Sequence, residues 1–171
     1  MNRLLFLINL IAFAGIITSC DEKIVPEEEL GVVINEVMPF NSTMVVDPLT
    51  GEFDDWIELY NLGKKNFDLS GYYLTDSKTN LSKWKFPEGT VILPDSFLCV
   101  WADGDTLQSG LHTNYKLSTT GETILLISPD FQLVDRVGYD EQLFQLSFAR
   151  IPNGTGEFVW GSPTFNNRNS Q

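Results

Sequence analysis

Five carboxylates in the first half of the chain lie close enough in sequence to share a cation. They are spread over a long polar segment and the apolar run that follows it: Asp47, Glu52, Asp54, Asp55 and Glu58, with Glu36 as a further neighbour. Ca²⁺ takes about six to eight oxygen ligands in flexible geometry, which makes these residues calcium candidates. No EF-hand spacing is present. The alternative is an ordinary solvated surface, since an acidic chain carries carboxylates everywhere.

Paired carboxylates also raise the hypothesis of glycoside hydrolysis. Asp54-Asp55 and Asp140-Glu141 are adjacent in sequence, and a glycosidase needs two carboxyl groups about 5 to 10 Å apart. With 23 acidic residues, such pairs arise by chance, and nothing in the sequence marks a raised pKa at either one. A nucleophile elbow, a P-loop and a zinc motif are absent. We therefore expect no enzyme, and a hydrolase with an unrecognised carboxylate site is the least favoured hypothesis.

Aromatic residues offer a different chemistry, because the C–H face of a sugar stacks on Trp or Tyr. The glycan candidates are Tyr72, Tyr73, Trp84 and Trp160. Successive side chains of a strand point to opposite faces, so one of Tyr72 and Tyr73 is expected in the core and the other outside. Packing within the fold is the alternative for each ring.

Cysteine and histidine are scarce, which limits nucleophile and metal chemistry. Cys20 and Cys99 are the two cysteines and His112 is the single histidine. Cys99 lies in an apolar run, where a free cysteine behaves as a small buried hydrophobe. One histidine leaves little room for a zinc site or a Cys-His nucleophile pair. Calcium is therefore the only cofactor for which candidates remain.

The first 19 residues have the pattern of a secretion signal. Arg3 precedes an uncharged run over residues 4–17, which is shorter than the ~20 residues that span a bilayer as a helix. The run ends at Ile17-Thr18-Ser19-Cys20, which resembles the lipobox of bacterial lipoproteins. The resemblance implies cleavage before Cys20 and acylation of its thiol. Each buried methylene contributes about 0.8 kcal/mol, so the acyl chains would hold the protein at a membrane.

Charge and length bound what the remaining chain can be. The whole chain has a formal net charge of -12, and loss of Arg3 with the signal makes the mature protein still more acidic. Such a surface repels phosphate backbones, whose binding relies on Lys and Arg, so no nucleic acid partner is expected. Residues 20–31 are charged and contain Pro26, as in an acidic tether. The rest is long enough for one core.

Short runs rich in β-branched and aromatic residues alternate with turn signals from residue 32 onward, as in an all-β sandwich or barrel. No long window shows helical periodicity. We expect a long loop over residues 39–54 and a polar end from residue 162 that frays. The expected strands are residues 32–38, 56–61, 72–75, 83–86, 91–93, 97–102, 122–128, 133–139 and 146–151, with a last edge at 158–160.

The order of these runs resembles the lamin-tail domain, an immunoglobulin-like antiparallel β-sandwich. The similarity rests on several blocks whose spacing is preserved across residues 32–167. The principal ones are Ile34-Asn35-Glu36-Val37-Met38, Asp55-Trp56-Ile57-Glu58-Leu59-Tyr60-Asn61, Asp68-Leu69-Ser70-Gly71 and the closing Ser162-Pro163-Thr164. We therefore divide the chain into a signal peptide (1–19), a tether with lipidated Cys20 (20–31), a lamin-tail-like domain (32–167) and a flexible C-terminus (168–171).

The resemblance implies a fold and leaves the ligand open, because function lies in sites that differ among proteins of one fold. We expect a lipid-anchored protein of the bacterial cell envelope, at the outer membrane or cell surface rather than the inner membrane. Its non-catalytic module would bind an unknown envelope or extracellular protein, through loops at one end of the sandwich or through an edge strand. A carbohydrate-binding surface lipoprotein is the alternative.

Overall fold

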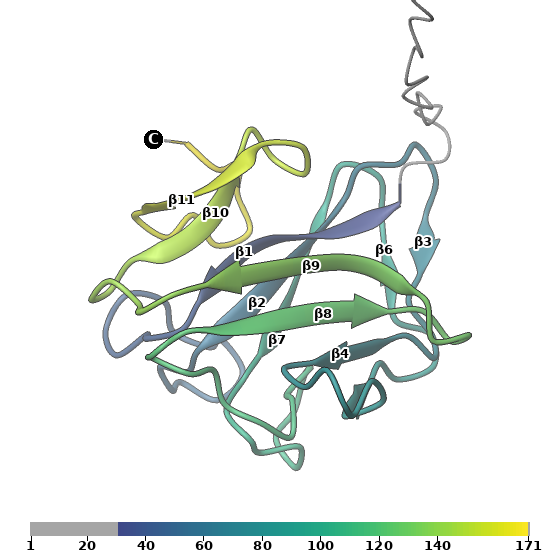
Figure 1. Ribbon diagram of the computed structural model, residues 1–171, viewed down its shortest axis with the longest axis horizontal. Helices are drawn as coiled ribbons and strands as arrows, with labels where there is room; N and C mark the ends of the chain where they lie inside the picture. Colours follow the sequence, from purple (N-terminus) through teal and green to yellow (C-terminus); the bar gives the residue numbers. More distant parts are fainter. Residues whose placement is uncertain (1–30, 171) are drawn as a thin grey trace, which may run out of the picture.

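Antiparallel strands make up the regular structure of residues 31–170, the part of the chain that the computed structural model describes. The first sheet contains Val32–Met38 (β1), Trp56–Asn61 (β2), Phe97–Trp101 (β7), Ser147–Ile151 (β10) and Glu157–Gly161 (β11). Its strand order is β11-β10-β1-β2-β7 (Figure 1).

The second sheet lies in front of the first in Figure 1. It contains Tyr73–Thr75 (β4), Trp84–Lys85 (β5), Glu122–Ile127 (β8) and Leu133–Tyr139 (β9), in the order β5-β4-β8-β9. A two-stranded sheet of Phe67–Asp68 (β3) and Val91–Ile92 (β6) completes the fold. The prediction of an all-β antiparallel sandwich is therefore confirmed.

Side chains from both sheets meet in one apolar core. Ile34, Ile57 and Leu59 of the first sheet and Ile124 and Leu126 of the second have no exposed surface. Each comes from a strand in which apolar residues alternate, so one face of each sheet turns toward the other. The Tyr72 and Tyr73 expectation is also met: Tyr72 packs against this core, while Tyr73 stacks on the ring of Phe131 outside it.

The outer face of the first sheet is covered as well. A β-bulge between Ile34 and Glu36 shifts the register of β1 against β2. Residues 162–169, which we call the C-terminal strap, lie on this face: Phe165 packs against Trp56 and Trp101 with ring centroids 5.5 and 5.6 Å away. All six residues of β2 are consequently buried.

Two expectations about the ends of elements need correction. The expected strands are present to within a residue at either end. The strand β3 was missed, because Phe67 is a single apolar residue directly before the turn signal Asp68-Leu69-Ser70-Gly71. The prediction that the C-terminus frays was wrong. Asn169 is 9% exposed, and its side-chain amide donates to the carbonyl of Arg150 at 2.9 Å. Arg168, expected in the flexible part, pairs with Asp95 at 2.7 Å. Polar composition misled here, because the strap is held by hydrogen bonds.

Candidate functional site

Exposed apolar side chains gather on the loops at one end of the sandwich. These loops follow β1 (residues 39–55), β7 (102–121) and β9 (140–146), and they lie at the left and lower left of Figure 1. We call their exposed apolar side chains the loop-end surface. Its members are Met44, Val46, Leu49, Phe53, Leu107, Leu143 and Phe144. Leu107 is 95%, Phe144 71% and Leu49 65% exposed, and exposed apolar side chains that share one end of a domain mark a candidate binding site.

Side-chain contacts tie the three loops together. The Gln145 amide donates to the hydroxyl of Thr43 at 2.9 Å, and the Phe144 ring lies 5.4 Å from that of Phe40. On the other side, the amide of Gln108 donates to the carboxylate of Glu52 at 3.0 Å. The loops therefore present one surface held by the scaffold, rather than three independent segments.

A buried histidine makes a further tie between two of the loops. His112 Nδ1 lies 2.8 Å from Asp103 Oδ2, and its Nε2 lies 3.1 Å from the carbonyl oxygen of Ser109 and 3.4 Å from Asp47 Oδ2. Both ring nitrogens thus face oxygen atoms. His112 therefore links the loop after β1 to the loop after β7.

The five calcium candidates are not brought together by the fold. Asp47 is buried beside His112, whereas Glu52 is exposed on the loop surface. Glu58 is buried on β2 among residues of the C-terminal strap. Within residues 31–170, no group of three or more His, Cys, Asp or Glu side chains is placed to hold a metal ion. Sequence proximity overestimated their spatial proximity, because Glu58 lies on β2 beneath the C-terminal strap whereas Asp47 faces His112 in the loop.

Asp54 and Asp55, the remaining two candidates, have raised carboxyl pKa values. Burial is the main cause at both. It raises the pKa of Asp55 to about 6, against the lowering effect of the Asn41 backbone N–H, which donates to Asp55 Oδ1 at 3.1 Å. The Asn41 side-chain amide also donates to the carbonyl of Asp54 at 2.8 Å. Asp55, through its carboxylate, and Asp54, through its backbone carbonyl, therefore belong to the hydrogen-bonded base of the loop after β1.

Glu36 and Glu58, which the sequence suggested as cation ligands, form a buried pair of carboxyl groups. Glu36 and Glu58 are register partners on β1 and β2, and neither has exposed surface. Glu36 accepts from the Thr164 backbone N–H at 2.9 Å and its hydroxyl at 2.7 Å. Glu58 accepts from the Asn166 backbone N–H at 2.7 Å and from Asn35 at 3.2 Å.

The environment of this pair favours the neutral acid. Burial raises the pKa of Glu36 and raises that of Glu58 to about 8, with the charge of Glu36 adding to the shift at Glu58. The hydrogen bonds from the strap act in the opposite direction at both groups. Because the C-terminal strap covers both carboxyl groups, the pair fastens the strap and has no path to a substrate.

The four glycan candidates do not form one platform. Trp84 is 8% exposed and packs edge-on against Phe86 in the core. Tyr72 and the partly buried Trp160 also pack against the core. Tyr73 remains outside, but one face of its ring is stacked on Phe131, with centroids 5.5 Å apart and planes at 10°. A stacking surface for a sugar is consequently not assembled from these rings.

The membrane-related predictions fall in the N-terminal part of the sequence. The signal peptide (1–19), Cys20 and nearly all of the tether (20–31) lie outside the described residues. Among residues 31–170, no helix is long and apolar enough to cross a membrane. Cys99 is half-buried on β7 as a free thiol, and burial raises its pKa well above the usual value.

Comparison with known proteins defines the class of this fold. A model of the Lamin Tail Domain family matches residues 26–141, which include β1 through β9. The molecule is thus an immunoglobulin-like module of a generally non-enzymatic class. The chain belongs to the Lamin Tail Domain family. No curated protein matched the chain.

Proposed function

We propose that this protein is a membrane-anchored lipoprotein of the bacterial envelope whose lamin-tail module binds a partner protein through the loop-end surface. The observation that carries the proposal is the placement of this surface relative to β1. The module is non-catalytic and needs no metal. Its localisation is the outer membrane or cell surface, with Cys20 as the lipidated residue.

The direction of β1 supports binding at the end far from the anchor. The proposed tether leads into Val32, the first residue of β1, and the loop after β1 begins beyond Met38 at the opposite end of the strand. A seven-residue strand separates these ends by roughly 20 Å. The loop-end surface would therefore face away from the membrane to which Cys20 is attached.

The chemistry of the loop-end surface suits a protein partner. Its apolar side chains are interspersed with exposed carboxylates, among them Glu52, Asp105, Asp140 and Glu141. A partner that combines an apolar pocket with a basic rim would cover the apolar atoms and match the charge. Nucleic acid and anionic lipid are disfavoured, because both would meet like charge.

Site-specific photo-crosslinking tests this proposal in producing cells. A photoreactive amino acid replaces Phe144 on the loop-end surface and, as the matched control, Leu93. Leu93 is also an exposed apolar residue, at 57%, but it lies between β6 and the start of β7, away from the loop end. We expect protein adducts from position 144 and few from position 93. Equal yields, or no adduct from either position, would contradict the proposal.

A further inference from the structure

A shallow groove on the outer face of the β4-β8-β9 sheet has a composition unlike the rest of this acidic protein. Its volume is about 590 Å³. Leu125 and Ile127 of β8 form the floor, Leu133 lines the β9 side, and Lys78 and Arg136 supply positive charge. None of the lining residues is acidic, although acidic residues outnumber basic ones 23 to 11 in the chain.

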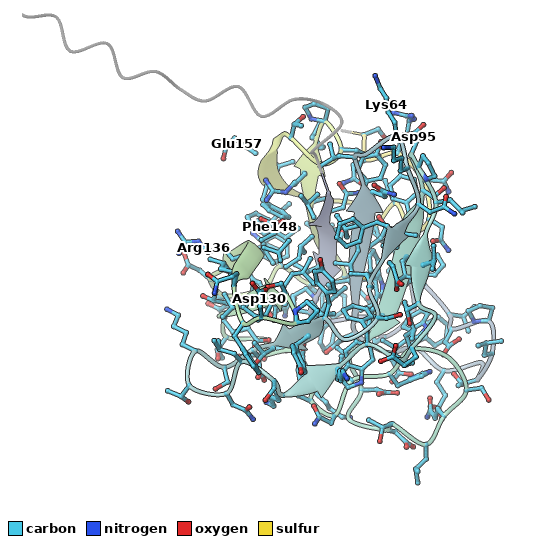
Figure 2. All side chains as sticks on the ribbon, turned by 90° about the vertical axis from the view of Figure 1, so that its right-hand side faces the viewer. Lys64, Asp95, Asp130, Arg136, Phe148 and Glu157 are labelled. Carbon is cyan, nitrogen blue, oxygen red and sulfur yellow. The ribbon has the colours of Figure 1, made fainter. Side chains whose placement is uncertain are left out.

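Several side chains that line the groove are exposed, so a partner could reach it. Phe131 and Leu133 are 52% and 54% exposed. Arg136 is exposed on β9, and Figure 2 shows its side chain at the left margin of the molecule. β9 is the last strand in the order of its sheet.

The lining favours a peptide segment over a sugar. One face of the Phe131 ring is already occupied by Tyr73, and no Asn, Gln, Asp or Glu lines the groove to hydrogen-bond sugar hydroxyls. Aliphatic floor residues with two cations suit a segment in which apolar side chains neighbour carboxylates.

The loop after β9 in the same protein has that composition. Asp140 and Glu141 are exposed acidic residues, and Leu143 and Phe144 follow them with 47% and 71% of their surfaces exposed. Lys and Arg are absent from residues 140–146. The segment and the groove are therefore complementary in charge and in apolar character, and the segment begins two residues after Gly138, which lines the groove.

We infer that residues 140–144 of one copy dock into the β4-β8-β9 groove of a second copy, in a head-to-tail contact. This inference rests on the proposed function, because it uses part of the loop-end surface and names its partner. Such a contact leaves one groove and one loop free on the pair, so copies add in rows.

Attachment to a membrane would allow even a weak contact to bring two copies together. One loop in a shallow groove buries less surface than a stable soluble dimer, which needs more than about 1,000 Å². Copies confined to one membrane meet at a high effective concentration.

Zero-length crosslinking of the full mature lipoprotein in phosphatidylcholine vesicles tests the contact. Equal amounts of heavy-isotope-labelled and unlabelled protein are mixed before a carbodiimide couples Lys78 to nearby carboxylates. We expect peptides that join Lys78 of one isotope to Asp140 or Glu141 of the other. Lys78→Arg is the matched control, because it keeps the charge and removes the reactive amine.

Charge reversal shows whether the contact depends on complementarity. Arg136→Glu and Glu141→Arg should each lower the yield of mixed-isotope crosslinks between Lys78 and Asp140, which both variants keep, about fivefold or more. The double variant should restore the yield, since the pair is re-formed with opposite polarity.

Crosslinks confined to single copies, or a double variant no better than either single one, would overturn the inference. The proposed function would survive that result if position 144 still photo-crosslinked to another protein. It would fail separately if position 144 gave no protein adduct.

Discussion

Glu36 and Glu58 lie directly opposite each other on β1 and β2, and the C-terminal strap hydrogen-bonds to both. The strap thus closes over two acids that would repel each other if both were ionised. One consequence is a stability that depends on the protonation of Glu58.

The pH dependence has a defined sign. The pKa of Glu58 is raised from 4.5 to about 8 in the folded protein, so the folded state binds a proton more tightly than the unfolded chain. The contribution of this group is fully present below pH 4.5 and is lost as the pH rises toward 8. Between these two pH values, one such group lowers the free energy of unfolding by up to about 1.4 kcal/mol for each unit by which the pH rises.

Glu58→Gln should flatten this dependence, because the amide has nearly the shape of the neutral acid and does not titrate. We expect urea unfolding curves from pH 5 to 8 to show a smaller loss of stability than the wild type. Glu88→Gln is the control, since the Glu88 side chain is 82% exposed. Parallel pH profiles for the wild type and Glu58→Gln would refute the assignment.

Phe165 should anchor the C-terminal strap through Trp56 and Trp101. Phe165→Ala removes this packing, and we expect a loss of about 2 kcal/mol in the free energy of unfolding. Phe144→Ala makes the same chemical change at a 71% exposed site and should cost less than about 1 kcal/mol. Guanidinium denaturation followed by Trp fluorescence compares them, and equal losses would show that the strap is not anchored by this ring.

His112→Ala should be among the most damaging single changes in the loops. It leaves the Asp103 carboxylate, which lies 2.8 Å from the ring, buried without this hydrogen-bond partner, and an unsatisfied buried polar group costs about 1 to 3 kcal/mol. Thermal unfolding at fixed pH measures the effect. A loss below about 1 kcal/mol would mean that the loops hold together without this link.

Gly121 should tolerate no side chain. Its φ is +99°, and an added Cβ would lie 2.8 Å from the carbonyl oxygen of Tyr139. Gly51 also has positive φ, at +80°, but an added Cβ would meet nothing within 4 Å. We expect Gly51→Ala to cost about 1 kcal/mol for backbone strain alone and Gly121→Ala clearly more. Equal midpoints in urea would contradict the close approach.

The strands were predictable because their signal is local. In β2, alternation places Ile57 and Leu59 in the core, and the same local pattern is visible in the sequence. The burial of Glu58 was not predictable, because the backbone N–H that donates a hydrogen bond to it belongs to Asn166, 108 residues further along the chain. A polar residue on the outer face of a strand normally faces water, and only the folded C-terminal strap reverses that expectation.

In the candidate site too, local features were predictable from the sequence and contacts between distant residues were not. The exposure of Leu143 and Phe144 could be predicted from their position in a short polar loop. Their proximity to the loop after β1 could not be predicted. The contact between Gln145 and Thr43 joins residues 102 positions apart. The calcium candidates are close in sequence but separate in the fold. Asp47 faces His112, whereas Glu58 faces the C-terminal strap.

The intact mass of the protein from the membrane fraction of a lipoprotein-processing host, expressed with its own signal, tests the central claim most directly. The orientation of the loop-end surface away from the membrane depends on the anchor preceding β1. We predict a mature protein that begins at Cys20 and carries diacylglycerol on its thiol. A mass that retains residues 1–19, or that lacks lipid, would contradict the account of a tethered binding module.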